Sequence, residues 1–140
     1  MDWKNWVEQD CKTFKVSDGQ NEYDARLFAG CYESNGNLAV LVYYFDPDME
    51  DWDLWNDLTV NTVTLAKTDP NKVSVALDTN NYAQGPDLVQ RLGIGTFESR
   101  FVSSGYCSYP VFSFDVAQLR LYDPLGVAEY EQLSISGLGR

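Results

Sequence analysis

Residues 22–46 read EYDARLFAGCYESNGNLAVLVYYFD and contain two runs of strand-forming residues with a turn between them. The runs are Glu22 to Glu33 and Leu38 to Asp46, joined by Ser34-Asn35-Gly36-Asn37. Asn-Gly between two such runs is the strongest short-range signal of a β-hairpin, because both residues tolerate the positive φ of a tight turn. The stretch predicts two neighbouring antiparallel strands.

Two more hairpins follow along the chain. One is predicted from residues 58–66 and 72–79, around Asp69-Pro70-Asn71, and another from residues 97–102 and 111–114, across a turn at 103–106. In Lys72 to Thr79, apolar and polar residues alternate with the period of a half-buried strand. We expect one antiparallel sheet to contain residues 24–33, 38–46, 58–66 and 72–79.

Helices are predicted before the first strand and between the second and third hairpins. Asp2 is a suitable N-cap, and apolar residues recur at helical spacing behind it, which predicts a helix over residues 3–12 packed on the sheet through Trp3 and Trp6. Pro86 to Leu92, closed by Gly93, predicts a second short helix. Residues 116–133 are ambiguous, and 134–140 are expected to be a frayed tail. The prediction is a single α+β domain over residues 1–140.

Composition restricts the classes of function. The 140 residues carry a net charge of −11, with 44% hydrophobic and 14% aromatic residues, which favours a folded globule. The negative charge disfavours direct contact with nucleic acid or with an anionic membrane. The first residues lack a secretory signal, and the longest apolar run, Leu38 to Phe45, is too short to span a bilayer. We expect a cytoplasmic protein whose Cys11, Cys31 and Cys107 are reduced thiols.

Histidine is absent from the sequence. Ser-His and Cys-His nucleophile pairs and histidine-based zinc sites therefore cannot form. No phosphate-binding or dinucleotide-binding glycine motif is present either. We expect no cofactor and no catalytic residues; any catalysis would rest on carboxylate pairs, a lone Cys or Lys, or a carboxylate-bound metal.

The densest chemical feature is the acidic segment, residues 46–57. It holds six carboxylates and two tryptophans and no basic residue. Such density is self-repelling and suggests a surface that meets a positive partner. The candidate partner-binding residues are Asp46, Asp48, Glu50, Asp51, Trp52, Asp53, Trp55 and Asp57. The segment faintly resembles a calcium loop, but it has Asp51 where that loop requires glycine.

Four strings of sequence carry a family resemblance. They are Leu58-Thr59-Val60-Asn61, Leu77-Asp78-Thr79-Asn80-Asn81, Gly93-Ile94-Gly95 and residues 104–115, SGYCSYPVFSFD. Together they resemble an uncharacterised family of small acidic proteins encoded on plasmids, phages and integrated elements of gut bacteria. The resemblance implies an accessory protein of a mobile element and assigns no catalytic residue. Judged from the residues alone, Asp78 to Asn81 is more typical of a strand-end cap than of a site that holds a ligand. Residues 104–107 are more typical of a turn with a packed Cys than of a reactive thiol.

Three functions compete. The first is a non-enzymatic inhibitor that binds a basic nucleic-acid-handling enzyme, such as a restriction or CRISPR nuclease, by presenting phosphate-like charge. If Asp46, Asp48 and Glu50 are extended, their side chains repeat about every 6.6 Å on one face. The second is a generic interaction or structural module, in which the acidic segment only blunts a sheet edge and Trp52 and Trp55 fold onto the sheet. The third is a carboxylate-dependent enzyme acting on carbohydrate.

Overall fold

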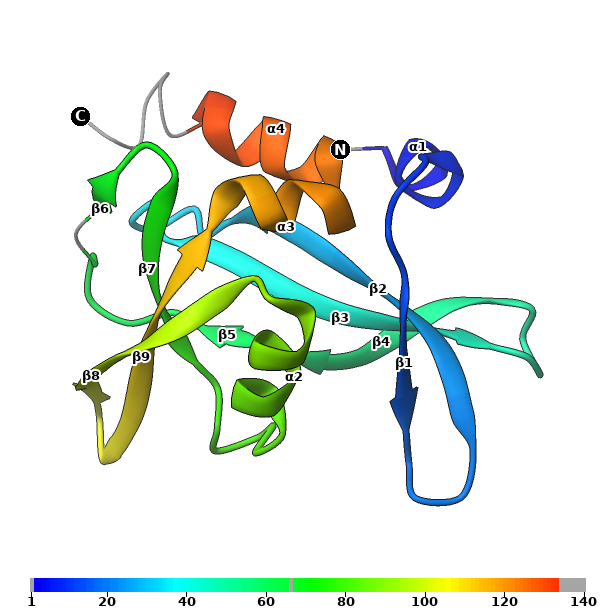
Figure 1. Ribbon diagram of the computed structural model, residues 1–140, viewed down its shortest axis with the longest axis horizontal. Coiled ribbons are helices and arrows are strands. Elements are labelled where there is room, and N and C mark those ends of the chain that lie inside the picture. Colours follow the sequence, from blue (N-terminus) through cyan, green and yellow to red (C-terminus); the bar gives the residue numbers. More distant parts are fainter. Residues whose placement is uncertain (1, 66, 134–140) are drawn as a thin grey trace.

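The strands of the protein form two antiparallel sheets, as seen in the computed structural model, which describes residues 2–65 and 67–133 (Figure 1). The first sheet has the order β1-β2-β3-β4, from β1 (Phe14–Ser17), β2 (Glu22–Cys31), β3 (Leu38–Asp46) and β4 (Asp51–Asp57). The second has the order β5-β7-β9-β8, from β5 (Thr59–Val60), β7 (Lys72–Leu77), β9 (Cys107–Asp115) and β8 (Gly95–Ser104), and β6 (Lys67–Asp69) pairs with β7. The predicted α+β class is confirmed.

The hairpin that the sequence predicted most clearly forms the centre of the first sheet. β2 and β3 pair antiparallel from Cys31 opposite Leu38 onward, and Gly36 in the turn has a φ of 77°. Alternate residues in the middle of the pair are buried on the face that turns toward the core: Ala25, Leu27 and Ala29 in β2, and Leu38, Val40 and Val42 in β3. The 97–114 hairpin is also confirmed, as β8 and β9.

The prediction that residues 58–66 and 72–79 join this same sheet is wrong. Leu58 still donates its N–H to Val40 O in β3, but the next residues pair with β7, so the chain changes sheets at that point. The strand expected over 58–66 shortens to β5, because side chains of the β2–β3 turn bind the following backbone. Asn37 Nδ2 donates to Val63 O, and Asn37 Oδ1 accepts from Leu65 N. These amide contacts replace ladder hydrogen bonds.

The first helix is shorter than predicted. α1 (Trp3–Glu8) begins at Asp2, whose carboxylate caps Lys4 N as expected, but Gln9 is already extended. Gln9 leaves the helix because its side-chain amide donates to Asp123 and accepts from Leu125 N. The chain then forms β1, an unpredicted strand whose burial alternates over only four residues.

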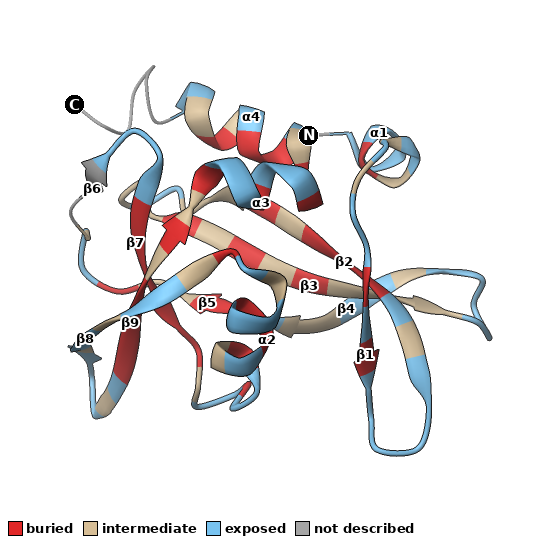
Figure 2. Ribbon diagram, in the orientation of Figure 1, coloured by how far each residue is buried: buried red, intermediate tan, exposed pale blue. Residues whose placement is uncertain are grey.

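The remaining helices lie toward the C-terminal end. α2 (Gly85–Leu92) ends at Gly93, which has a φ of 69°, as predicted. The ambiguous region contains α3 (Val116–Tyr122) and α4 (Pro124–Leu133), while residues 134–140 lie outside the described part. α3 and α4 lie beside one another, and α4 contacts β2 (Figure 1). Buried residues of both sheets, α2, α3 and α4 make one contiguous core, which leaves the tips of the β1–β2 and β3–β4 hairpins exposed (Figure 2).

Candidate functional site

The acidic segment forms the β3–β4 hairpin, which projects from the body of the protein at the right of Figure 1. Its residues 47–50 form the turn. Asp46 Oδ1 accepts from the N–H groups of Asp48 and Met49, and Glu50 has a φ of 51°. The idea that Asp46, Asp48 and Glu50 follow one extended face is therefore wrong: the Asp46 side chain folds the backbone into a turn.

The two candidate tryptophans lie on opposite faces of the first sheet. Trp52 packs against Phe45 and Trp6 on the outer face, whereas Trp55 packs against Tyr44 and Tyr23 on the inner face. The two residues are three apart, and side chains alternate between faces along a strand, so they lie on opposite sides. The bulge beside Tyr43 follows Leu54 and shifts the pairing of Asn56 and Asp57. Both indoles are half-buried. Because they lie on opposite faces, a single flat partner surface cannot contact both.

Carboxylates gather on the inner face beside Trp55. Asp46 pairs with Asp51, and Tyr44 with Asp53, so all four side chains lie on the same side of the hairpin. Burial raises the pKa of the Tyr44 phenol, and the negative charges of Asp46 and Asp53 raise it further. We call Asp46, Asp51, Asp53, Tyr23, Tyr44 and Trp55 the acidic aromatic surface. In the described part of the chain, none of the six carboxylates of residues 46–57 lies within ion-pair distance of a basic side chain.

The same hairpin carries an edge strand, and its carboxylates also cap that edge. Leu58 N–H points to β3, so the N–H of Asp57, one residue earlier, points to the free edge, where it donates to Asn56 Oδ1. The same bond recurs at Trp52 N, which donates to Asp51 Oδ1 at 2.8 Å, and at Leu54 N, which donates to Asp53 Oδ1 at 2.8 Å. The expectation that the acidic segment blunts a sheet edge thus has a structural basis, in a strand rather than in a loop.

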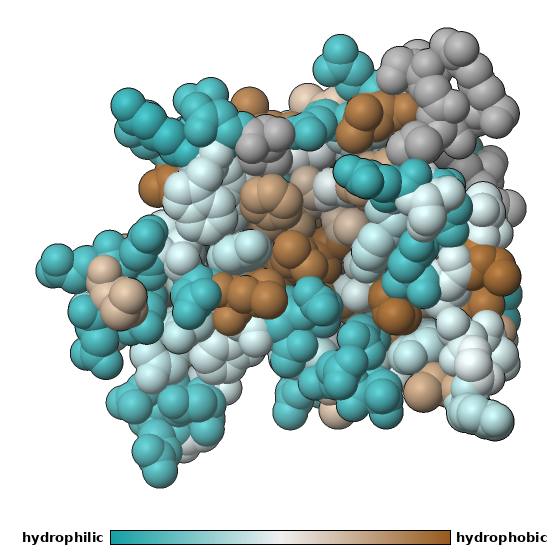
Figure 3. All heavy atoms as spheres, turned by 180° about the vertical axis from the view of Figure 1, so that it is seen from behind, coloured by the Kyte–Doolittle hydropathy of each residue, from teal (hydrophilic) through white to brown (hydrophobic). Residues whose placement is uncertain are grey.

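A buried cation holds the outer face together. The guanidinium carbon of Arg26 lies 4.3 Å from the centre of the Trp6 ring and 5.2 Å from that of Trp52. Its Nη atoms donate to Val7 O and Trp6 O at the end of α1, while its Nε has no partner within the described residues. Figure 3 shows the molecule from behind, where hydrophobic side chains gather near the middle and hydrophilic ones cover the projections.

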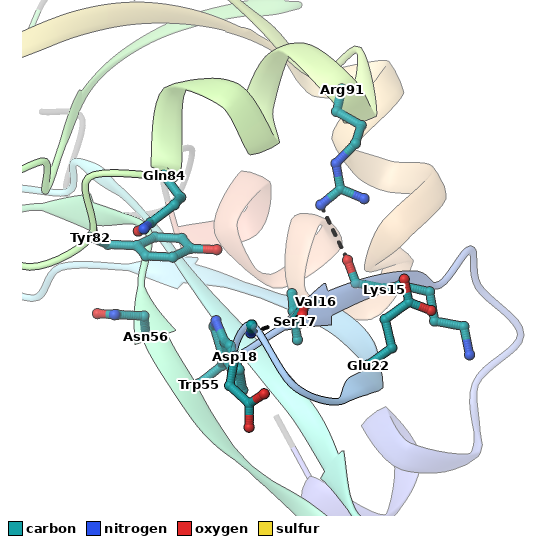
Figure 4. A pocket seen from close by; sticks show the side chains of 11 residues that line it. Lys15, Val16, Ser17, Asp18, Glu22, Trp55, Asn56, Tyr82, Gln84 and Arg91 are labelled. Carbon is teal, nitrogen blue, oxygen red and sulfur yellow. Dashed lines mark hydrogen bonds between the residues drawn. The ribbon is translucent and has the colours of Figure 1, made fainter.

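A pocket of about 810 Å³ lies between the β1–β2 hairpin, β4, and α2 with the loop before it. Its lining is mostly polar, with two aromatic side chains: Lys15, Val16, Ser17, Asp18, Gly19, Glu22, Trp55, Asn56, Tyr82, Gln84 and Arg91. Figure 4 shows the Tyr82 hydroxyl, at the left, and the Arg91 guanidinium, at the upper right, both directed toward the middle of this group. Trp55 belongs to both the pocket and the acidic aromatic surface, so the two are continuous.

The pKa of one carboxyl at the rim of this pocket is lowered. The backbone N–H groups of Asn21 and Gln20 hold the pKa of the Asp18 carboxyl below its usual value, so Asp18 stays ionised and is a poor proton donor. No group of three or more potential metal-ligating side chains occurs among residues 2–65 and 67–133.

The structure places the other two motifs singled out in the sequence at a strand end and at a hairpin turn. Asp78 accepts from the backbone and side-chain nitrogens of Asn81, as expected for a strand-end cap. Cys107 follows the β8–β9 turn, in which Gly105 has a φ of 62°. Cys11, Cys31 and Cys107 are free, half-buried thiols.

Residues 27–133 match the family model of a domain of unknown function, DUF4313. The chain belongs to the DUF4313 family. The match includes all four strings that carried the resemblance to an uncharacterised family. No curated protein and no solved structure matches the chain. Among the described residues of this DUF4313 protein, no helix is long and apolar enough to cross a membrane.

The pocket residues were missed by sequence reasoning. Lys15, Tyr82 and Arg91 come from β1, a loop and α2, and neither their spacing nor their type marks them in the sequence. Only Trp55 was singled out. A signal did exist for Tyr82, because it directly follows the strand-end cap at Asp78 to Asn81, whose turn fixes it beside Trp55.

Proposed function

We propose that this protein is a non-enzymatic binding protein whose β3–β4 hairpin contacts a basic protein partner. One observation carries the proposal: six carboxylates project on one hairpin with no cation beside them in the described structure. A cluster of this kind opposes its own folding through repulsion and produces a strong local field. A positively charged partner relieves the repulsion, and the field speeds association.

The partner we propose is a nucleic-acid-handling enzyme with a positively charged channel, such as a restriction or CRISPR nuclease. The support is chemical, because such a channel is built to accept closely spaced anionic groups. Asp51 and Asp53 have strand spacing on one face and are the pair best placed to occupy it. Trp55, rather than Trp52, is the buried anchor of this contact, because it shares the inner face with these carboxylates.

The test compares two variants that each lose four negative charges. The hairpin variant is Asp48→Asn, Glu50→Gln, Asp51→Asn, Asp53→Asn. The control variant is Glu8→Gln, Asp10→Asn, Glu33→Gln, Asp87→Asn, whose carboxylates are exposed and make no ion pair in the described structure. Each variant is used to capture proteins from a bacterial lysate at low and at high salt, and captured proteins are identified by mass spectrometry.

We expect both variants to melt within a few degrees of the parent, since exposed charge changes rarely exceed about 0.5 kcal/mol. Only the hairpin variant should lose a basic partner, and the loss should be largest at low salt, where charges act over about 10 Å or more. If both variants capture the same proteins with the same salt dependence, the generic module is the better description. Unfolding of the hairpin variant alone would mean that the carboxylates serve the fold.

A further inference from the structure

The two edges of the first sheet differ in what occupies their outward backbone N–H groups. At the β4 edge, the side chains of Asp51, Asp53 and Asn56 occupy the outward N–H groups. At the opposite edge, β1 is the last strand in the sheet order, and residues 15–17 of β1 line the pocket. One edge is closed by its own side chains, and the other opens onto a cavity.

The pairing of β1 with β2 determines which β1 backbone groups face this cavity. Asp18 N donates to Asn21 O, so that pair closes the β1–β2 hairpin as a hydrogen-bonded pair. Hydrogen-bonded and non-hydrogen-bonded pairs alternate, so Ser17 and Lys15 direct their N–H and C=O groups away from β2. The bond from Arg91 Nη2 to Lys15 O, at 3.1 Å, agrees with this assignment (Figure 4). Among the residues that the structure describes, it is the only hydrogen bond to these outward groups.

A buried donor on the facing wall also lacks an acceptor. Tyr82 is 8% exposed, and its hydroxyl points toward the cavity (Figure 4). Burial raises the pKa of the Tyr82 phenol, and the nearby Trp55 indole, which can only donate, opposes that rise. The phenolic proton therefore has no acceptor among the residues that the structure describes. A ligand that carries carbonyl groups would satisfy Tyr82 and Arg91 on one side, and Lys15 and Ser17 N–H on the other.

We propose that the pocket binds an extended, basic peptide segment, which adds to the free edge of β1 as a further strand. Main-chain pairing at an open edge supplies affinity, and the lining of the cavity selects side chains. Asp18 and Glu22 border the pocket beside Lys15 and Arg91, and Trp55 connects it to the acidic aromatic surface. A basic segment complements Asp18, Glu22 and that surface. The occupant is a segment of the basic partner, so this inference rests on the proposed function.

The test uses two synthetic peptides with identical side chains, arginine alternating with valine and threonine. One has an ordinary backbone, and the other is N-methylated at every backbone nitrogen, which removes its donors and keeps another strand at a distance. Each is titrated to about 1 mM into the isotope-labelled full chain, and amide hydrogen exchange is followed residue by residue.

We expect the ordinary peptide to slow exchange of the Lys15 and Ser17 amides at least about tenfold, and the methylated one to leave it unchanged. Tyr82→Phe should weaken binding of the ordinary peptide severalfold, while Tyr106→Phe, at an exposed tyrosine, should not. Equal binding of both peptides, or no protection of Lys15 and Ser17, overturns strand addition.

The two proposals can fail separately. If the hairpin variant loses its partner while the ordinary peptide gives no protection at β1, the charge contact stands and strand addition is refuted. If the peptide protects β1 while the hairpin variant captures all the same proteins, the pocket binds peptide and the hairpin proposal is refuted.

Discussion

Arg26 is the residue on which the outer face most depends. It is 3% exposed, stacks on Trp6 and Trp52, and donates to the last carbonyls of α1. Arg26→Met keeps most of the volume but removes the donors and the cation. Since breaking a buried charged hydrogen-bond network costs about 3–5 kcal/mol, we expect a loss of at least about 2 kcal/mol in unfolding free energy, measured by urea denaturation.

Arg100→Met is the matched control for that change. Arg100 is a hydrogen-bonded arginine too, but its partner is the Glu98 carboxylate, and about half of its side chain is exposed. Exposed pairs contribute about 0–1 kcal/mol, so the control should lie close to the parent. Equal losses in the two variants would show that burial between the indoles adds nothing to Arg26.

At the scale of single elements, the start of α3 predicts a pH dependence. Asp115 is its N-cap, and the Gln118 N–H, with help from Asn71 and Lys72, holds the pKa of the Asp115 carboxyl below its ordinary value. A lowered folded pKa means that the stabilisation is present above the unfolded pKa and is lost as pH falls through the folded pKa. Asp115→Ala should cost about 1 kcal/mol at pH 7.

The difference in unfolding free energy between the parent and Asp115→Ala should shrink when urea unfolding is repeated near pH 3. The parent carboxyl is then partly protonated and stabilises the folded state less. Asp115→Asn serves as the control, since its amide oxygen still caps the helix but has no charge to lose. A cost for Asp115→Ala that stays constant between the two pH values would contradict the assignment.

The β4 edge leads to a prediction about association. Asp51→Ala with Asp53→Ala removes the acceptors that cover the N–H groups of Trp52 and Leu54 and leaves an edge open to pairing with another copy. We expect this double variant to form larger species, measured by light scattering against concentration. The double Asn variant loses the same charge but keeps the side-chain oxygens, so it should scatter less. If both variants scatter alike, charge rather than capping protects the edge.

Over the whole molecule, the sequence predicted individual hairpins and helix ends better than their arrangement into two sheets. The Asn35-Gly36 hairpin and the Gly93 helix end follow from local backbone chemistry, and both are confirmed. The early end of the strand expected over 58–66 could not be predicted, because it depends on Asn37, a side chain more than twenty residues earlier. The bulge after Leu54 has no local signal in the sequence, and the pocket needs segments that meet only after folding.

The N-terminal part of the chain limits how far the domain can be shortened without loss of stability. The family match begins at residue 27, yet Trp6 and Phe14 are buried, and Gln9 binds Asp123 at the start of α4. Burying a large apolar side chain contributes about 1.5–3 kcal/mol, and a whole domain has only about 5–15 kcal/mol. A fragment trimmed to 27–133 should therefore melt without a cooperative transition, and a separate peptide of residues 1–26 should restore one. Homology boundaries and folding boundaries do not coincide in this protein, and trimming to the former would discard part of its core.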